Sequence, residues 1–93
     1  MATHKSAIKR HRQSLKRRER NRRVKGGIRK GTKRVRKAVA EGDLETAQEW
    51  LAITIKRLDK AAEKGIIHKN NAARRKSRLT RLVNQAMAAA QAQ

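Results

Sequence analysis

The sequence contains no cysteine, proline, tyrosine or phenylalanine, and a single tryptophan, Trp50. Without cysteine, disulfides, thiol catalysis and thiolate metal sites are excluded. Without proline, and with abundant alanine, arginine, lysine, leucine and glutamine, the chain has a high helix propensity along its whole length. One tryptophan cannot form the aromatic platform of single-strand-binding proteins, so we expect it to pack on an apolar face. These absences predict an all-α protein.

Acidic residues are scarce as well. Against 27 Lys and Arg, the 93 residues include 7 Asp and Glu, which gives a net charge of +20. A chain of this length suits one small domain, and such self-repulsion disfavours its compact state unless a polyanion offsets it. Nucleic acid is therefore the leading class of partner, ahead of an anionic membrane or an acidic protein. Composition does not choose between RNA and DNA.

Long apolar runs are also missing from the sequence. No stretch approaches the roughly 20 apolar residues of a membrane-spanning helix. No apolar segment follows the basic N-terminus, as one would in a secretory signal. We therefore expect a soluble cytoplasmic protein with no membrane partner.

The side chains that could carry chemistry form no recognisable site. His4, His11 and His68 lack the spacing and the acidic neighbours of a metal site, so we expect neither a metal nor a cofactor. Most carboxylates gather on one predicted helix, no serine has an obvious base, and no glycine-rich loop follows a strand. The chain is therefore not expected to be an enzyme.

Charge divides the chain into three zones. Residues 1–37 hold 17 Lys and Arg and one acid, residues 38–63 hold 3 basic and 6 acidic residues, and residues 64–93 hold 7 basic residues and no acid. We therefore expect the two ends to face a polyanion and the middle zone to face something else.

The first predicted helix has one core-facing stripe, formed by Val24, Ile28, Val35 and Val39 at helical spacing, and it ends near Gly42. Glycines 26, 27 and 31 each cost about 1 kcal/mol against alanine inside a helix. The sequence therefore leaves open whether the first helix is straight or kinked among them.

The residues before that stripe look different. Ile8 and Leu15 fall almost on the opposite side of the helix, so they do not belong to the same packed face. Between His4 and Lys25 the chain has 11 Lys and Arg and one acid, a density that predicts phosphate contacts. We therefore expect a basic nucleic-acid-binding extension over residues 1–23 and a bundle over residues 24–93.

The second helix is predicted over residues 44–64, with Asp43 as its N-cap and Gly65 as its left-handed C-cap. Its apolar face consists of Leu44, Ala47, Leu51, Ile55, Leu58 and Ala62. The third helix is predicted from Asn70 or Asn71, either of which can cap it, to about Ala90. Its apolar face consists of Ala72, Leu79, Leu82, Val83, Ala86 and Ala90.

These three core-facing segments have matched lengths of about 18, 21 and 21 residues and short connections. Matched lengths and short loops favour antiparallel neighbours. The sequence therefore predicts an all-α, antiparallel three-helix bundle with a long basic N-terminal helical extension.

The start of the third helix carries an unusual charge. Arg74, Arg75 and Lys76 are predicted in its first turns, although the positive end of the helix dipole favours acids there. Free backbone N–H groups at a helix start suit a phosphate. We therefore expect one phosphate there, surrounded by Lys69, Asn70, Arg74 and Arg75.

Two segments carry a resemblance to a known family. KSAIKRHRQSLKRRERNRR, from Lys5, and KGIIHKNNAARRKSRL, from Lys64, resemble the bacterial small-subunit ribosomal protein S-twenty family, and the similarity covers essentially the whole chain. The resemblance implies a three-helix bundle with a long, unbroken first helix. The glycines at 26, 27 and 31 differ from the pattern expected for such a helix.

The resemblance also implies a function. Such a protein is a structural constituent of the small ribosomal subunit in the cytoplasm, binds 16S ribosomal RNA directly at the 5′ domain and the long penultimate helix, and stabilises the RNA fold during assembly. No homo-oligomer is expected. The residues expected to line RNA by this resemblance are Lys5, Lys9, Arg10, Arg12, Lys16, Arg17, Arg18, Arg22, His68, Lys69, Asn70, Arg74, Arg75 and Arg78.

Two other functions remain open on the residues alone. A nucleoid-type DNA-binding protein is the main alternative, and the nucleic acid that copurifies at moderate salt discriminates it from an RNA-binding protein. A cationic membrane-binding protein is disfavoured because the basic segments lack large apolar faces.

Overall fold

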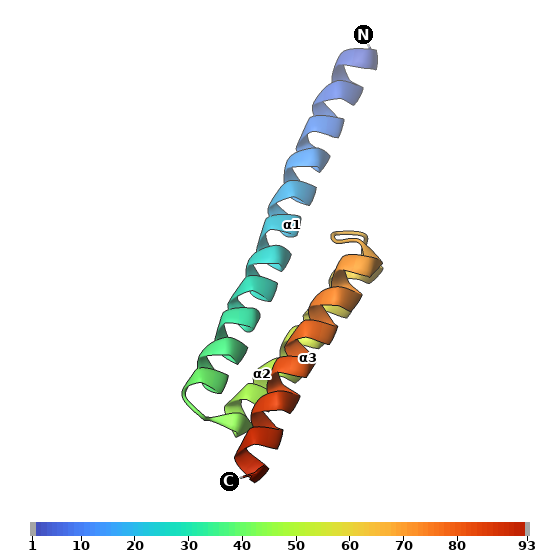
Figure 1. Cartoon of the computed structure of the whole chain (residues 1–93). Coiled ribbons are helices and arrows are strands. Elements are labelled where there is room, and N and C mark those ends of the chain that lie inside the picture. The colour runs from blue at the N-terminus through green and yellow to red at the C-terminus, as the bar shows by residue number, and fades with distance from the viewer. Residues whose placement is uncertain (1, 93) are drawn as a thin grey trace.

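The structure is a computed structural model that describes residues 2–92, with side chains from residue 5 onward. Over that range it consists of three helices and no strand: α1 (Ala2–Ala40), α2 (Leu44–Glu63) and α3 (Lys69–Ala92). The helices alternate in direction, and α1 continues well beyond the other two (Figure 1). The predicted all-α bundle is therefore confirmed.

The molecule is elongated because α1 is much longer than its partners. Its radius of gyration is 18.3 Å, against about 12 Å for a compact domain of this length. In the projecting part, Ile8 and Leu15 are 43% and 48% exposed, so their stripe lies off the core as expected. One continuous helix carries both parts, and the division of the chain near residue 24 stays a prediction.

The structure has no kink at the glycines, a question that the sequence leaves open. α1 is a single α-helix through Gly26, Gly27 and Gly31, and Figure 1 shows no break there. Contacts with α2 hold these turns: Nη1 of Arg57 donates to the carbonyl of Gly27 at 2.8 Å, and Gly31 packs directly on Thr54. These tertiary contacts offset the low helix propensity of glycine.

Both turns between helices are built in the same way, with a glycine at positive φ. Gly42 and Gly65 both have φ of 75°. After α1, the N–H groups of Gly42 and Asp43 donate to the carbonyls of Val39 and Ala38 at 3.1 and 2.9 Å, which is a Schellman motif. After α2, Gly65 and the residue that follows it repeat the pattern. The C-cap predicted at Gly65 is confirmed.

The start of α2 also agrees with the sequence. Asp43 is its N-cap, and its Oδ1 accepts a hydrogen bond from the N–H of Thr46 at 3.3 Å. The helix ends at Glu63, one residue before the predicted limit.

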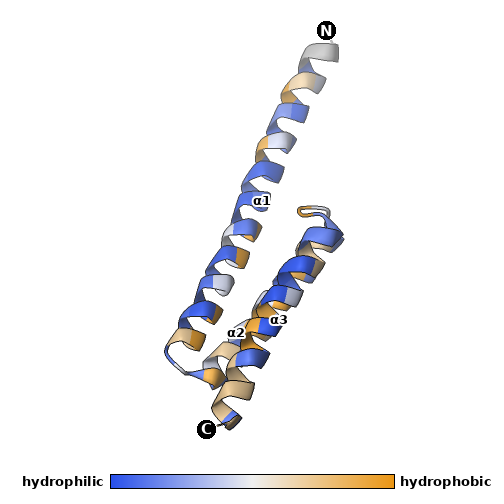
Figure 2. Ribbon diagram, viewed as in Figure 1, coloured by the Kyte–Doolittle hydropathy of each residue, from blue (hydrophilic) through white to orange (hydrophobic). Residues whose placement is uncertain are grey.

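The core consists of two clusters along the bundle, and Figure 2 shows apolar residues on the sides of the helices that face each other. One cluster contains Val35, Ala38, Ala47, Leu79 and Val83, and the other contains Ile28, Leu58, Ala61 and Ala72. The predicted stripes supply most of these residues. Ala90, on the predicted apolar face of α3, is exposed instead. Trp50 packs against the first cluster, as expected.

α1 and α2 approach each other closely at Gly31 and Thr54. Thr54 is fully buried, and its hydroxyl donates to the Trp50 carbonyl at 2.7 Å. A Cβ on Gly31 would lie 2.3 Å from Oγ1 of Thr54. Glycine is therefore required at position 31 by packing and not by backbone conformation, and Thr54 is a buried residue that the apolar pattern missed.

We predict opposite effects for two identical substitutions in α1. Gly31→Ala lowers the free energy of unfolding by about 1–3 kcal/mol, because α1 and α2 must separate. Gly26→Ala raises it by about 0.5–1 kcal/mol, since no atom lies within 4 Å of the added Cβ and alanine favours the helix. Denaturant unfolding of both variants checks this, and a stabilised Gly31→Ala variant contradicts the packing argument.

Candidate nucleic-acid interface

The cations of α1 are arranged in series along the helix. Residues three or four positions apart lie on the same side of a helix, and two such series are present. The first series contains the cations Arg18, Lys25, Arg29 and Arg36, with the polar residues Ser14, Asn21 and Thr32 at the positions between them. The second series consists of cations alone: Lys5, Lys9, Arg12, Lys16, Arg20 and Arg23. At about 100° per residue, the two series lie roughly 180° apart around α1. α1 therefore presents cations on nearly opposite sides.

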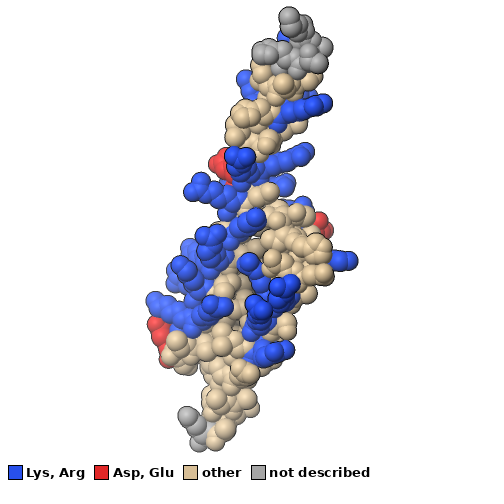
Figure 3. Space-filling model, turned by 45° about the horizontal axis from the view of Figure 1, so that its top comes forward, with Lys and Arg blue, Asp and Glu red and all other residues tan. Residues whose placement is uncertain are grey.

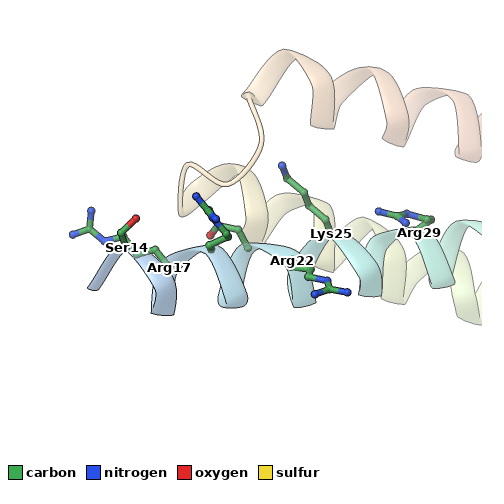
Figure 4. Close-up of a pocket in the computed structure, with 7 residues that line it drawn as sticks. Ser14, Arg17, Arg22, Lys25 and Arg29 are labelled. Atoms are coloured by element: carbon green, nitrogen blue, oxygen red, sulfur yellow. The ribbon is translucent and has the colours of Figure 1, made fainter. Parts of the chain in front are cut away.

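The first series continues onto α3. Its residues line a hollow along α1 together with Arg17 and Arg22, and in Figure 4 Lys25 and Arg22 extend in different directions from the helix. Further along, Thr32 and Arg36 line a second hollow with Arg75 and Arg78 of α3. We call this series, with Arg75 and Arg78, the α1/α3 face. In Figure 3, Lys and Arg side chains follow α1 and continue onto α3.

The second series continues onto α2. Arg20 and Arg23 line a hollow of about 470 Å³ with Arg57, Lys60 and Lys64 of α2. We call this series, with Arg57, Lys60 and Lys64, the α1/α2 face. The floor of the hollow is apolar and includes Val24 and Ala61. Low-dielectric walls strengthen the field of the five cations above them.

Between the two faces, the outward side of α1 is also cationic. Lys30, Lys33 and Arg34 line a shallow hollow there with Arg29.

Arg34 and Arg57 each lie over the Trp50 ring, at 5.6 and 5.8 Å from its centroid. These distances are within the range of a cation–π interaction, so the indole helps to hold an arginine of each helix at the α1/α2 seam.

Four of the seven acids lie on α2, away from the cations of the two faces. At 100° per residue, Glu45, Glu49, Asp59 and Glu63 fall on the side of α2 that turns away from the core. Within the described residues, the one ion pair joins Asp59 to Lys76 at 2.6 Å. Both side chains are substantially exposed, so this pair contributes about 0–1 kcal/mol. The cations of the two faces are therefore available to an external anion.

The start of α3 differs from the prediction that Asn70 or Asn71 caps it. The helix begins at Lys69, and His68 occupies the cap position: its carbonyl accepts from the N–H of Ala72 at 3.1 Å, and its Nδ1 accepts from the N–H of Asn70 at 3.1 Å. The imidazole of His68 therefore caps the helix, a role that the sequence predicts for Asn70 or Asn71.

This earlier start changes the environment of the arginines of α3. Arg74 lies in the second turn, and the dipole acts mainly within the first turn. Arg75 donates from Nε to Oδ1 of Asn71 at 2.8 Å and lines the hollow on the α1/α3 face. Of the four residues expected around one phosphate at the helix start, Arg75 lines a hollow with Arg36 and Arg78. Lys69, Asn70 and Arg74 do not line that hollow.

The sequence-predicted contact residues are all exposed in the structure. Lys5, Lys9, Arg12 and Lys16 belong to the α1/α2 face, whereas the hollows of the α1/α3 face bring together other members of the predicted set. These members are Arg17, Arg18, Arg22, Arg75 and Arg78. Arg10 lies on a third side of α1, and His68, Lys69, Asn70 and Arg74 lie around the start of α3. Whether these residues contact RNA stays a prediction.

Sequence reasoning missed part of both faces. The cations of α2 that line the α1/α2 hollow, Arg57, Lys60 and Lys64, were overlooked because the middle zone was judged by its net charge. That average hides the separation of cations and acids around the helix. A helical projection of the charges in α2 would have found them, as would the three-or-four spacing for Arg20, Arg23, Lys25, Arg29 and Arg36.

Membrane-spanning helices and clusters of metal-binding side chains are both absent from the described part of the chain. None of its helices combines the length and apolar character needed to cross a bilayer. Its histidines, aspartates and glutamates form no group of three that could hold a metal ion, and the side chain of His4 lies outside the described residues.

Comparison with known proteins decides the family. The profile of the family described as Ribosomal protein S20 matches residues 2–84. The chain belongs to that family. It is 56% identical over 84 residues to the small ribosomal subunit protein bS20 of Geotalea daltonii and, equally, to that of Oleidesulfovibrio alaskensis, covering 90% of this chain and 97% of each relative. It is 54% identical over 89 residues to the bS20 protein of Solidesulfovibrio magneticus, covering 96% of this chain and all of that one.

The expected family is therefore confirmed. As a member of the ribosomal protein S20 family, the chain is a structural component of the bacterial small ribosomal subunit in the cytoplasm and not an enzyme. Its association with the ribosome and ribosomal RNA follows from the same membership.

We predict that His68 has a capping role separable from any contact with RNA. His68→Ala lowers the free energy of unfolding by about 1 kcal/mol, because the N–H of Asn70 loses its acceptor, whereas His68→Asn retains a capping oxygen and most of the stability. Thermal unfolding checks this. Equal losses in the two variants would contradict the capping role, and a loss of RNA affinity in the stable His68→Asn variant would assign an RNA contact to the imidazole.

Proposed function

We propose that this protein binds small-subunit ribosomal RNA directly through the α1/α3 and α1/α2 faces, so that RNA lies against two sides of α1. The observation that carries the proposal is the placement of two cationic series on nearly opposite sides of one helix, each continued onto a second helix. Within the bundle, α2 and α3 flank α1, so the two faces open in different directions. Each face therefore suits a different RNA segment.

The chemistry of both faces favours phosphate over bases. Arginine guanidinium groups bind phosphate through paired N–H donors. Trp50, the one Phe, Trp or Tyr of the chain, lies beneath Arg34 and Arg57 and lines none of the three hollows, so it is not placed to stack on a base. Recognition is therefore of RNA shape and backbone, as is general for structured RNA. The protein fixes the relative position of two RNA segments during assembly of the subunit.

The two segments proposed are the 5′ domain and the long penultimate helix, which the resemblance implies and which two separate faces accommodate. The contact residues are the fourteen inferred from the resemblance together with Lys25, Arg29 and Arg36 of the α1/α3 face and Arg20, Arg23, Arg57, Lys60 and Lys64 of the α1/α2 face. A second copy of the chain is not a partner, because two molecules with a charge of +20 repel. No feature of the described structure favours the alternative of a DNA-binding protein.

The two faces can be tested with matched pairs of neutral substitutions at exposed positions. Arg18→Gln with Lys25→Gln removes charge from the α1/α3 face, and Arg23→Gln with Lys60→Gln removes the same charge from the α1/α2 face. We predict that one pair weakens binding to an isolated 5′-domain RNA and the other weakens binding to the isolated penultimate helix. Each lost phosphate contact should reduce the slope of log affinity against log salt by about 0.7–0.9.

Lys56→Gln is the control, because this exposed lysine lies on the acidic side of α2, and it should leave both affinities unchanged. If both pairs weaken both RNAs equally, the assignment of one segment to each face is wrong. Tighter binding of a DNA duplex than of either RNA would contradict the function itself.

A further inference from the structure

The contact between α1 and α3 is the weakest seam of the bundle. Both helices pack mainly on α2 and only sparsely on each other. In the described residues, side-chain hydrogen bonds join α1 to α2, through Arg57 and Gly27, and α2 to α3, through Asp59 and Lys76. No such bond joins α1 to α3 there. Two of the three seams are thus closed by the protein's own side chains, and the third is not.

Three guanidinium groups stand at this open seam. Arg36 of α1 and Arg75 and Arg78 of α3 line one hollow of about 250 Å³. Arg75 is held in place by its 2.8 Å hydrogen bond to Asn71. None of the three arginines is ion-paired in the described part of the chain. Cations from two helices therefore meet across a seam with no counter-charge.

The floor of the hollow raises the strength of this repulsion. It is formed by Leu79, which is 4% exposed, and by the half-buried Leu82. Charges above an apolar floor are screened less than charges in bulk water, so like charges repel more strongly and an anion is attracted more strongly. A phosphate group matches the site, because guanidinium groups on both sides can donate to its oxygens.

We propose that one phosphate group of the RNA backbone occupies this hollow and bridges α1 to α3, so that closure of the bundle is coupled to RNA binding. This inference rests on the proposed function for the source of the phosphate. The other hollow of the α1/α3 face is lined by α1 alone, so a phosphate there draws no second helix in. The α1/α2 seam is already tied by Arg57 and needs no anion. Coupling is therefore specific to Arg36, Arg75 and Arg78.

Thermal unfolding of the full chain, followed by circular dichroism in sodium phosphate and in sodium chloride at equal ionic strength, tests the coupling. A ligand that binds only the folded state raises the unfolding midpoint, and we predict a gain of at least about 3 °C for the parent in phosphate. If the parent is only partly helical in chloride, the same coupling appears as helix gained on titration with phosphate.

Arg36→Gln and Arg78→Gln should each lose more than half of this gain, while being no less stable than the parent in chloride. Phosphate also stabilises proteins in general through exclusion from their surfaces, and Arg81→Gln reports that part. It removes the same charge from α3 but lines a different hollow, between α2 and α3. If Arg36→Gln and Arg78→Gln keep the full gain, or if Arg81→Gln loses as much as they do, the proposal is overturned.

Hydrogen exchange of the α3 amides with bound ribosomal RNA identifies the source of the phosphate. RNA should slow this exchange in the parent and in Arg81→Gln, and slow it less in Arg78→Gln. Unchanged protection in Arg78→Gln would mean that the hollow takes free phosphate only, which contradicts the coupling to RNA. A parent chain that stabilises in phosphate but does not bind RNA would instead overturn the proposed function and leave the site as a phosphate site.

Discussion

Repulsion among 27 Lys and Arg is the constraint on which the rest of the structure depends. The core that opposes it is small: its largest fully buried side chains are Ile28, Leu58, Val35, Val83 and Thr54, and a fully buried apolar side chain contributes about 1.5–3 kcal/mol. The fold reduces the repulsion by elongation, which separates the charges, and four of the seven acids lie on the outward side of α2. The cations of the α1/α3 and α1/α2 faces have no acidic partner in the described structure, and these are the charges that a polyanion neutralises.

The length and continuity of α1 connect the fold to the function. One helix carries both cationic series. Because it passes Gly26, Gly27 and Gly31 without a break, the part that projects beyond the bundle keeps a fixed orientation relative to α2 and α3. Gly31 allows α2 to approach closely, and Arg57 ties α2 to α1 at Gly27. Two of the three glycines that weaken α1, Gly27 and Gly31, are therefore positions at which α2 contacts it.

The sequence predicts the fold well and the site in part, for physical reasons. Apolar spacing locates Ile28, Val35, Leu58, Leu79 and Val83, and a cap aspartate and a turn glycine mark the ends of α2, because these signals are local. The burial of Thr54 and the continuity of α1 depend on contacts that form only in the folded chain. The cap at His68 was not predicted because histidine is not among the residues that usually cap a helix. The cations of α2 were missed since charge was averaged along the chain and not around the helix.

The central claim is that ribosomal RNA neutralises this protein on two opposite sides of α1. Electron cryomicroscopy of the small subunit with this chain bound tests it most directly. The account predicts phosphate groups of two different RNA segments, one set against the α1/α3 face and the other against the α1/α2 face, with none against Glu45, Glu49 and Glu63 of α2. RNA confined to one side of α1, or RNA packed on the acidic side of α2, would contradict it.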